Sequence, residues 1–338
     1  MLGVTRLPPW FEQAFAELES VFSDSRNADS FKHLASTLIL GEAQWTVSGL
    51  ARGISRPGED AKSRRAYDYF FDGADWSPTD LAQCDAEYVF DQLQVGAGDH
   101  VLLHIDDTFV PKTGRRYRWR RPVVQSRRRR DGVGQQDRHF QPSGRGRLCS
   151  LPCADVRSRG SCAGFRRAER KTEIAVEGIV TPLQLPAGAA LTVIFDSAYY
   201  GDERIVAIQN QGHDAVCRLK SDKHVSSQGV VWTRRVDALA STLEYESTTI
   251  TVRGKEKTYD VASEVVEIED VGPVKIVASK TDDITRRYLS TDLGRSAAEI
   301  LELVEHRWSI ETIHEESNAK FGFKQYQLER KQAIERYI

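Results

Sequence analysis

The sequence has one methionine and five cysteines, and no two cysteines are spaced as Cys-x-x-Cys. An odd number of cysteines without that spacing favours neither a disulfide framework nor a zinc site, so we expect free thiols. No apolar run approaches the roughly 20 residues that a membrane-spanning helix needs, and the N-terminus lacks the apolar core of a signal peptide. The composition therefore predicts a soluble, cytoplasmic protein with no membrane contact, and 338 residues suffice for two or three domains.

Lysine is absent between Arg115 and Arg170, where seventeen arginines stand against four acidic residues. This stretch carries a charge of +13 in a chain whose net charge is −2, so the remainder carries −15. It has neither helix nor strand periodicity, which predicts that it is disordered and offers no partner strands. One interpretation is a basic arm that neutralises phosphates. The other, which we favour, is translation out of frame, because arginine, glycine, serine, proline and cysteine rise together while lysine vanishes.

Two apolar runs end on an aspartate. Residues 101–107 are Val-Leu-Leu-His-Ile-Asp-Asp, and residues 191–196 are Leu-Thr-Val-Ile-Phe-Asp. Such runs predict buried strands that end at Asp106 and Asp196, and a strand–helix–strand order around the second one predicts an α/β core. Neighbouring strands of this kind would bring two carboxylates together, and a bound cation is the usual reason that a protein tolerates their repulsion.

The first 96 residues predict helices. Within them, two short helices joined by a turn at Pro57 and Gly58 could form a helix-turn-helix whose second helix is basic, with Lys62, Arg64 and Arg65 as DNA-binding candidates. The alternative is an ordinary helical bundle with a solvated charged face. The sequence leaves both open.

Alternating sequences follow residue 221, such as Thr-Ile-Thr-Val at 249–252 and Val-Lys-Ile-Val at 274–277. They predict an antiparallel β subdomain inserted over residues 221–291. A long helix should begin after Ser296, with Glu299 completing a capping box. On this helix Arg307 and Glu311 are four residues apart and share a face, where they could also form a simple surface ion pair.

Five segments, in a fixed order, carry a resemblance to a known family. They are His-Ile-Asp-Asp-Thr-Phe-Val-Pro-Lys at 104–112, Ile-Phe-Asp-Ser-Ala-Tyr-Tyr-Gly-Asp at 194–202, Tyr-Leu-Ser-Thr-Asp at 288–292, His-Arg-Trp-Ser-Ile-Glu at 306–311 and Lys-Phe-Gly-Phe-Lys-Gln-Tyr at 320–326. Together they resemble the bacterial insertion-sequence DDE transposases of the IS-four clan. The resemblance implies an RNase H-like catalytic core with a β insertion, and it maps the catalytic, metal-binding carboxylates to Asp106, Asp196 and Glu311. Asp107 is the less expected ligand.

The resemblance also implies a function. Two Mg²⁺ ions, with Mn²⁺ as a possible substitute, would activate water to cut DNA at the transposon ends and then activate the freed 3′-hydroxyl for attack on target DNA. Arg307 would hold a phosphate near the end, and Trp232 could stack on an extruded base, although a core tryptophan is the commoner case. The implied partners are terminal inverted repeats, target DNA and a second copy of the chain, near the bacterial nucleoid.

Two positions depart from the family signature: Val304 stands where the family has tyrosine, and Asn318 where it has lysine. Lys320 points to the opposite side of the helix. The chain also ends inside an apparent helix at 332–338, so a damaged copy fits as well. We expect four parts: helices over 1–96, the first part of the core over 97–220, the β insertion over 221–291, and the catalytic helix over 292–338. The alternatives to a transposase are a DNA-binding relic that regulates transposition and a structure-selective nuclease.

Overall fold

The computed structural model describes most of the chain, with gaps. The described residues are 2–3, 7–40, 46–55, 62–106, 148–151, 176, 180–227, 232–252, 254–281, 284–321, 328, 332–333 and 336. Several sequence predictions lie outside them: Asp107, the Pro57–Gly58 turn, the arginine-rich stretch except residues 148–151, most of the helix expected over 171–180, and most of residues 322–338.

Helices fill the N-terminal part, as their apolar spacing predicted. Phe11 and Phe15 are buried one turn apart, and the Gly49 amide donates a hydrogen bond to the Thr46 hydroxyl (3.1 Å), which caps the helix that begins at Val47. The helices are α1 (Pro9–Leu18), η1 (Glu19–Val21), α2 (Ser25–Leu40), α3 (Val47–Gly53), α4 (Arg64–Asp72) and α5 (Pro78–Leu93), and the short strands β1 (Leu2–Gly3) and β2 (Ile54–Ser55) pair in parallel.

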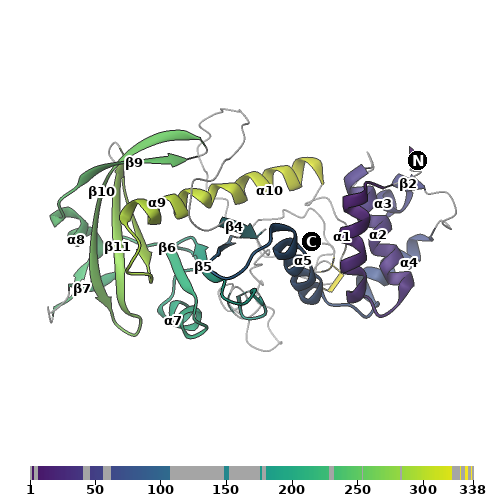
Figure 1. The fold of residues 1–338 in the computed structure, drawn as a ribbon, viewed down its shortest axis with the longest axis horizontal. Coiled ribbons are helices and arrows are strands. Elements are labelled where there is room, and N and C mark those ends of the chain that lie inside the picture. The colour runs from purple at the N-terminus through teal and green to yellow at the C-terminus, as the bar shows by residue number, and fades with distance from the viewer. Residues whose placement is uncertain are drawn as a thin grey trace, which may run out of the picture.

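The core of these helices includes residues from the end of the chain. Phe70 and Trp76 stack at its centre with ring centroids 4.9 Å apart, Ala333 is buried in it, and Leu328 packs against it. The Arg336 guanidinium donates a hydrogen bond to the Trp76 carbonyl (2.6 Å). The two ends of the chain therefore pack together, as Figure 1 shows by the C-terminal mark beside α5.

One mixed sheet runs from the middle of the molecule to the end opposite the N-terminal helices (Figure 1), in the order β4-β3-β5-β6-β12-β11-β10-β7-β8, with β9 paired to β10. The first four strands run parallel and the following ones antiparallel. The strands are β3 (His100–Ile105), β4 (Leu148–Leu151), β5 (Ala190–Phe195), β6 (Asp214–Arg218), β7 (His224–Ser227), β8 (Arg234–Arg235), β9 (Glu246–Val252), β10 (Lys255–Ile268), β11 (Gly272–Thr281) and β12 (Ile284–Ser290).

Strand β4 corrects one expectation. It lies inside the arginine-rich stretch, where we expected no strand, yet it pairs in parallel with β3 from His100 to Leu103. Four residues, Leu-Cys-Ser-Leu, are too few to show a periodicity of their own. The free edge of β3 supplies the hydrogen-bonding partner that makes them a strand. β3 therefore has a neighbour on each side, because it lies between β4 and β5.

The antiparallel strands predicted over residues 221–291 are present, but they continue the sheet of the parallel strands. β12 pairs with β6, with Tyr288 opposite Arg218 and Leu289 opposite Cys217. A shared ladder fixes the antiparallel strands rigidly to those that end on aspartate. The sequence shows strand periodicity but not which strand edges pair, so it could not reveal this continuity.

The two faces of the sheet are covered by different helices. Leu103 and Ile105 face a core that includes residues of α5 and of α7 (Asp202–Asn210), whereas Leu102 and Ile194 face the core formed with α9 (Ala297–His306). Side chains alternate along a strand. Asp106 and Asp196 consequently fall on the α9 side.

The predicted long helix is present in two parts, α9 and α10 (Trp308–Lys320), which run along one face of the sheet (Figure 1). The Ser296 hydroxyl accepts the Glu299 amide and the Glu299 carboxylate accepts the Ser296 amide, so the predicted capping box is confirmed. Around Arg307 the backbone hydrogen bonds join residues that are three positions apart. The Arg307 amide donates to the Val304 carbonyl and the Ile310 amide donates to the Arg307 carbonyl (both 3.1 Å).

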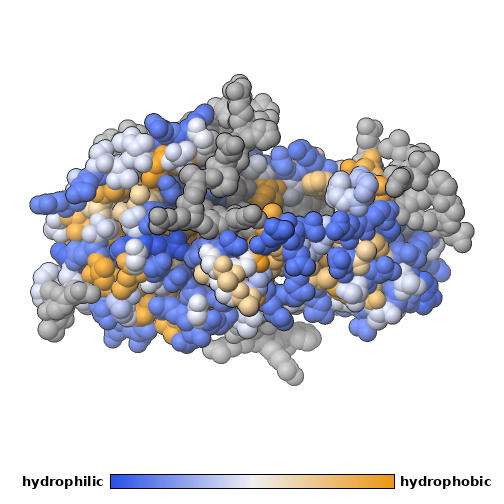
Figure 2. Space-filling view, in the orientation of Figure 1, coloured by the Kyte–Doolittle hydropathy of each residue, from blue (hydrophilic) through white to orange (hydrophobic). Residues whose placement is uncertain are grey.

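The surface seen in Figure 2 is covered mostly by hydrophilic residues. Among the described residues, no helix has both the length and the apolar character to cross a membrane.

Candidate active site

Asp106 and Asp196 end two neighbouring parallel strands at the same level. β3 and β5 pair from His100 opposite Ala190 to Ile105 opposite Phe195, and each aspartate follows its strand directly. This confirms the predicted adjacency of the two strands. The aspartates occupy successive positions across one edge of the sheet, where two carboxylates can share a cation.

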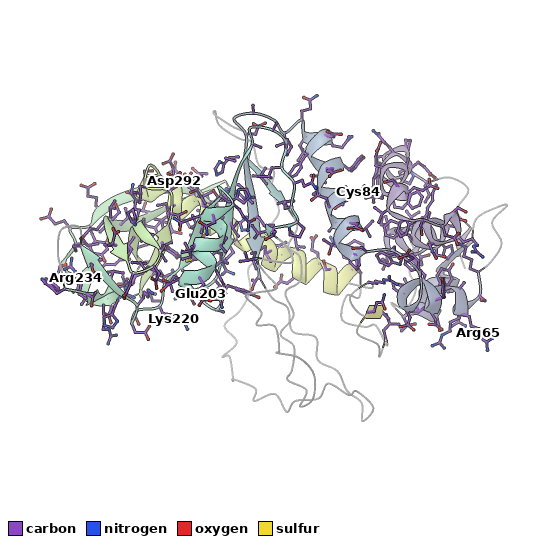
Figure 3. All side chains as sticks on the ribbon, turned by 90° about the horizontal axis from the view of Figure 1, so that it is seen from below. Arg65, Cys84, Glu203, Lys220, Arg234 and Asp292 are labelled. Atoms are coloured by element: carbon purple, nitrogen blue, oxygen red, sulfur yellow. The ribbon has the colours of Figure 1, made fainter. Side chains whose placement is uncertain are left out.

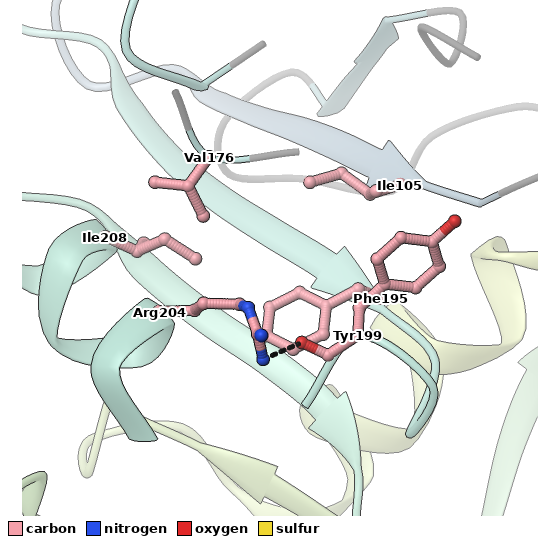
Figure 4. A pocket seen from close by; sticks show the side chains of 6 residues that line it. All are labelled: Ile105, Val176, Phe195, Tyr199, Arg204 and Ile208. Atoms are coloured by element: carbon pink, nitrogen blue, oxygen red, sulfur yellow. Dashed lines mark hydrogen bonds between the residues drawn. The ribbon is translucent and has the colours of Figure 1, made fainter. Parts of the chain in front are cut away.

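The turn after Asp196 is held by several hydrogen bonds. The Ser197 amide donates to the Asp196 carboxylate (2.6 Å), and the Tyr199 amide donates to the Asp196 carbonyl (2.9 Å). From α7, the Arg204 guanidinium donates to the carbonyls of Tyr199 (3.4 Å) and Tyr200 (2.9 Å), the first of which Figure 4 marks. These bonds fix the chain that presents the Asp196 carboxylate.

Gly201 lets this guanidinium approach the backbone. A Cβ atom at Gly201 would lie 2.0 Å from Arg204 Nη1, so any side chain there would displace Arg204. Arg204 also lines a small pocket with Ile105, Phe195 and Tyr199 (Figure 4). The pocket lies beside the two strands that end on aspartate.

Arg307, the residue between α9 and α10, contacts Asp106 on the α9 side of the sheet. Its Nη1 donates to the Asp106 carboxylate at 3.3 Å, and the two side chains are 23% and 20% exposed. The guanidinium places a positive charge on one of the two carboxylates. This edge of the sheet therefore accepts a cation close to an aspartate.

Glu311 lies four residues beyond Arg307 on α10, which is about one helical turn. Its side chain is outside the described part of the structure, so the convergence of all three carboxylates stays a prediction. Among the described residues, no group of three or more histidine, cysteine, aspartate or glutamate side chains could hold a metal ion.

Sequence analysis missed Arg218, which continues the row of the two aspartates. Phe195 pairs with Cys217 on β6, so the next position along each chain sets Arg218, the last residue of β6, beside Asp196. Tyr288 lies opposite Arg218, and burial raises the pKa of its hydroxyl. The signal in the sequence was the apolar run at 215–217, which ends on a charged residue as the other two runs do.

A second missed group surrounds Asp202, the first residue of α7. Lys223 Nζ donates to both Asp202 oxygens (2.8 and 2.6 Å), and the Tyr200 hydroxyl donates to Oδ1 (2.5 Å). Burial and then this hydrogen bond raise the pKa of Tyr200, so the hydroxyl stays protonated. Burial is also the main cause of the raised pKa of the Cys217 thiol, followed by the charges of Asp196 and Asp202. Both carboxylates thus act on the same thiol.

His104, two residues before Asp106, is buried, and neither ring nitrogen has a hydrogen-bond partner among the described residues. Burial, followed by the charges of His306 and Arg307, lowers the pKa of His104 to about 4. The ring is therefore neutral at neutral pH, and the edge gains no positive charge from it.

Trp232 is 64% exposed, so the alternative of a core tryptophan is wrong. The Arg234 guanidinium lies 5.9 Å from its ring centroid and donates to Thr242 of α8 (Val236–Thr242). β8 is at the far end of the sheet from β3, and Figure 3 shows Arg234 at one end of the molecule. The structure does not bring Trp232 together with the aspartates.

The basic residues proposed for the second short helix differ in their surroundings. Lys62 Nζ donates to the Arg26 carbonyl (2.7 Å) and to the Ser30 hydroxyl (3.1 Å), so Lys62 connects to α2. Arg64 and Arg65 are exposed, and Arg64 pairs with Asp68 (3.5 Å). Figure 3 shows Arg65 at the end of the molecule opposite Arg234.

The two residues that depart from the family signature, Val304 and Asn318, lie on the long helix formed by α9 and α10. Val304 is partly buried and packs against the core between α9 and the sheet. Lys320 is exposed and pairs with Glu316 (3.1 Å). Lys320 therefore stabilises its own helix, while the side chain of Asn318 lies outside the described residues.

A mixed α/β sheet that ends on paired aspartates, with helices at the N-terminus, is consistent with RNase H-like nucleases of the DDE class. Residues 173–338 match the family described as Transposase DDE domain. This part of the chain is therefore similar to the catalytic domain of DDE transposases. It spans Asp196, Arg307 and Glu311 and begins after Asp106. No curated protein matches the chain.

Proposed function

We propose that this chain is an IS-four-like transposase that cuts DNA at transposon ends and transfers the freed strand to target DNA. One observation carries the proposal: Asp106 and Asp196 follow paired strands in register, and Arg307, the residue just before the helix that carries Glu311, reaches Asp106. The family match supports the transposase role, and it does not favour the alternative of a DNA-binding relic.

The residues at this edge suit a divalent metal ion. Asp106, Asp196 and Glu311 would supply carboxylate oxygens, which Mg²⁺ prefers and Mn²⁺ also accepts. The contact of Arg307 with Asp106 supports the proposal, because it puts a positive charge beside one of the proposed ligands. When bound, the metal supplies an activated water and neutralises charge on the phosphoryl group.

The chain itself would position the reactants. The Ser197 amide orients the Asp196 carboxylate. Arg307, once a metal neutralises Asp106, would turn its two N–H edges to a DNA phosphate, the geometry that a guanidinium binds best. The charge of the phosphate replaces that of the carboxylate, so Arg307 remains paired in both states.

Other DNA contacts would lie further away. Trp232 offers an exposed ring for stacking on an unpaired base, at a distance from the aspartates. Arg64 and Arg65 would contact phosphates at the helical end, and the bonds of Lys62 to α2 would support that helix. Two copies of the chain on paired transposon ends would complete the assembly.

The test is Mg²⁺-dependent cleavage of DNA that carries the ends of the element. We expect Asp196→Asn and Asp106→Asn each to lower the cleavage rate by at least about 100-fold, because a metal ligand is lost. Asp270→Asn is the matched control, since Asp270 lies in the exposed β10–β11 turn with φ +70°, which asparagine also adopts.

Cleavage by Asp196→Asn at the rate of the unchanged protein would remove the proposal. Joining of the cut strand to a second DNA separates a transposase from a structure-selective nuclease, which would cut without joining.

A further inference from the structure

Asp202 and Lys223 join the turns that follow two neighbouring strands. Asp202 lies six residues after Asp196 at the end of β5, and Lys223 lies in the turn between β6 and β7. Lys223 Nζ contacts both carboxylate oxygens of Asp202, at 2.8 and 2.6 Å. Because β5 and β6 are paired in parallel, both turns lie at the edge that carries the aspartates.

The pair is partly shielded from water and anchored at both residues. The side chains of Lys223 and Asp202 are 23% and 29% exposed, and the Tyr200 hydroxyl donates to the same carboxylate. The Lys223 carbonyl accepts the Val236 amide (2.8 Å), and the Lys223 amide donates to the Lys220 carbonyl (3.3 Å). A partly buried ion pair with both partners anchored holds its geometry better than a surface pair does.

Tyr200 adds a third connection. Its ring lies beneath the ammonium group, with Lys223 Nζ 5.2 Å from the ring centroid. Tyr200 is itself in the turn that Arg204 holds through its carbonyl. The turn from Asp196 to Asp202 is therefore attached to α7 through Arg204 and to the β6–β7 turn through Lys223.

We propose that Asp202 and Lys223 are positioning residues that hold the turn after β5, so that the Asp196 carboxylate keeps the orientation in which it binds a divalent metal. This inference rests on the proposed function of Asp196. Neither residue needs to touch the metal or DNA. They act as the outer partners of metal ligands commonly do, by restricting how the ligand can turn.

The experiment measures Mn²⁺ binding to the full chain by isothermal titration calorimetry, without DNA. We expect Lys223→Met to weaken Mn²⁺ binding about ten-fold to a hundred-fold, the range found when outer partners of ligands are lost. Asp202→Asn keeps the size of the side chain and should weaken binding in the same direction. The double variant should bind no more weakly than Lys223→Met alone, because the two residues act as one pair.

Glu12 and Lys32 provide a matched control in the N-terminal helices. Lys32 Nζ pairs with Glu12 and lies 4.8 Å from the Phe15 ring centroid, as Lys223 pairs with Asp202 over the Tyr200 ring, and the Lys32 side chain is 24% exposed. Lys32→Met removes the same kind of contact outside the sheet that carries Asp196, and Mn²⁺ binding should stay unchanged. Lys223→Arg restores a cation and should recover binding in part.

A purely structural pair gives a different result. If Lys223→Met and Asp202→Asn lower the melting temperature but bind Mn²⁺ within two-fold of the unchanged protein, the proposal is overturned. The proposed function fails separately, if the unchanged protein binds Mn²⁺ through Asp196 but cuts no DNA at any metal concentration.

Discussion

The Arg307 guanidinium lies 3.3 Å from the Asp106 carboxylate, although 201 positions separate the two residues in the sequence. The contact joins the end of β3 to the junction of α9 and α10. Asp106 consequently has a cationic partner at the edge where a metal would bind. If a metal binds there as proposed, Arg307 competes with it for the Asp106 carboxylate.

Removing Arg307 should therefore separate metal binding from DNA binding. We expect Arg307→Gln to bind Mn²⁺ about two- to five-fold more tightly, because a partly exposed ion pair contributes about 0.5–1 kcal/mol that the metal no longer displaces. DNA affinity should fall, because the phosphate loses a charged donor. Calorimetry with Mn²⁺ and fluorescence anisotropy with labelled DNA measure the two effects, and Arg307→Lys should retain part of both. Unchanged Mn²⁺ affinity in Arg307→Gln would contradict this account.

His104 should make stability depend on pH. Its pKa is lowered from 6.5 to about 4, so between these values the unfolded chain binds a proton that the folded chain does not. The contribution of His104 to the free energy of unfolding is thus fully present above about pH 6.5 and is lost as the pH drops towards 4, by at most about 3.4 kcal/mol at 1.36 kcal/mol per unit. Urea unfolding in a metal chelator at pH 5 and pH 7.5 measures the difference.

His104→Leu should remove this part of the pH dependence, because leucine does not titrate. The comparison with the unchanged protein isolates His104 from other histidines. If both proteins lose equal stability between pH 7.5 and pH 5, His104 is not the source.

Arg336 should stabilise the helical end of the molecule. It donates to the carbonyls of Phe71 (3.4 Å) and Trp76 (2.6 Å), and it lies 4.9 Å from the Trp76 ring centroid. Arg336→Met should lower the free energy of unfolding by about 1–2 kcal/mol, because buried carbonyls lose their donor. The melting temperature should fall by about 2–4 °C.

Arg64→Met is the control for Arg336, because Arg64 is exposed and makes a single ion pair within α4. Its effect should stay within about 0.5 kcal/mol. A melting temperature that is equal in both variants would mean that the end of the chain adds no stability.

The strands that end on Asp106 and Asp196 could be predicted because each combines a buried apolar run with an acidic residue at its end. Their pairing followed, since two buried parallel strands have few other partners in an α/β core. The capping box at Ser296 was equally local, because both of its hydrogen bonds lie within four residues. Interactions between near neighbours in the sequence leave a signature in the residues themselves.

The contacts that the sequence did not reveal join distant segments. β4 has no periodicity and becomes a strand through the edge of β3. Arg218 and Lys223 gain their places from the register of β6 and from the turn that follows it. A charged residue near the end of a strand looks the same in the sequence whatever lies beside it, so only the fold shows its neighbours.

Apart from β4, the sequence alone determined where the main helices and strands lie and which acids end the two buried strands, because those choices depend on periodicity and on short-range hydrogen bonds. The tertiary structure decided that the antiparallel strands extend the same sheet, that Arg307 lies on Asp106, and that Trp232 is exposed far from both aspartates. These outcomes depend on strand register and on packing between segments that lie far apart in the sequence. No local pattern encodes either.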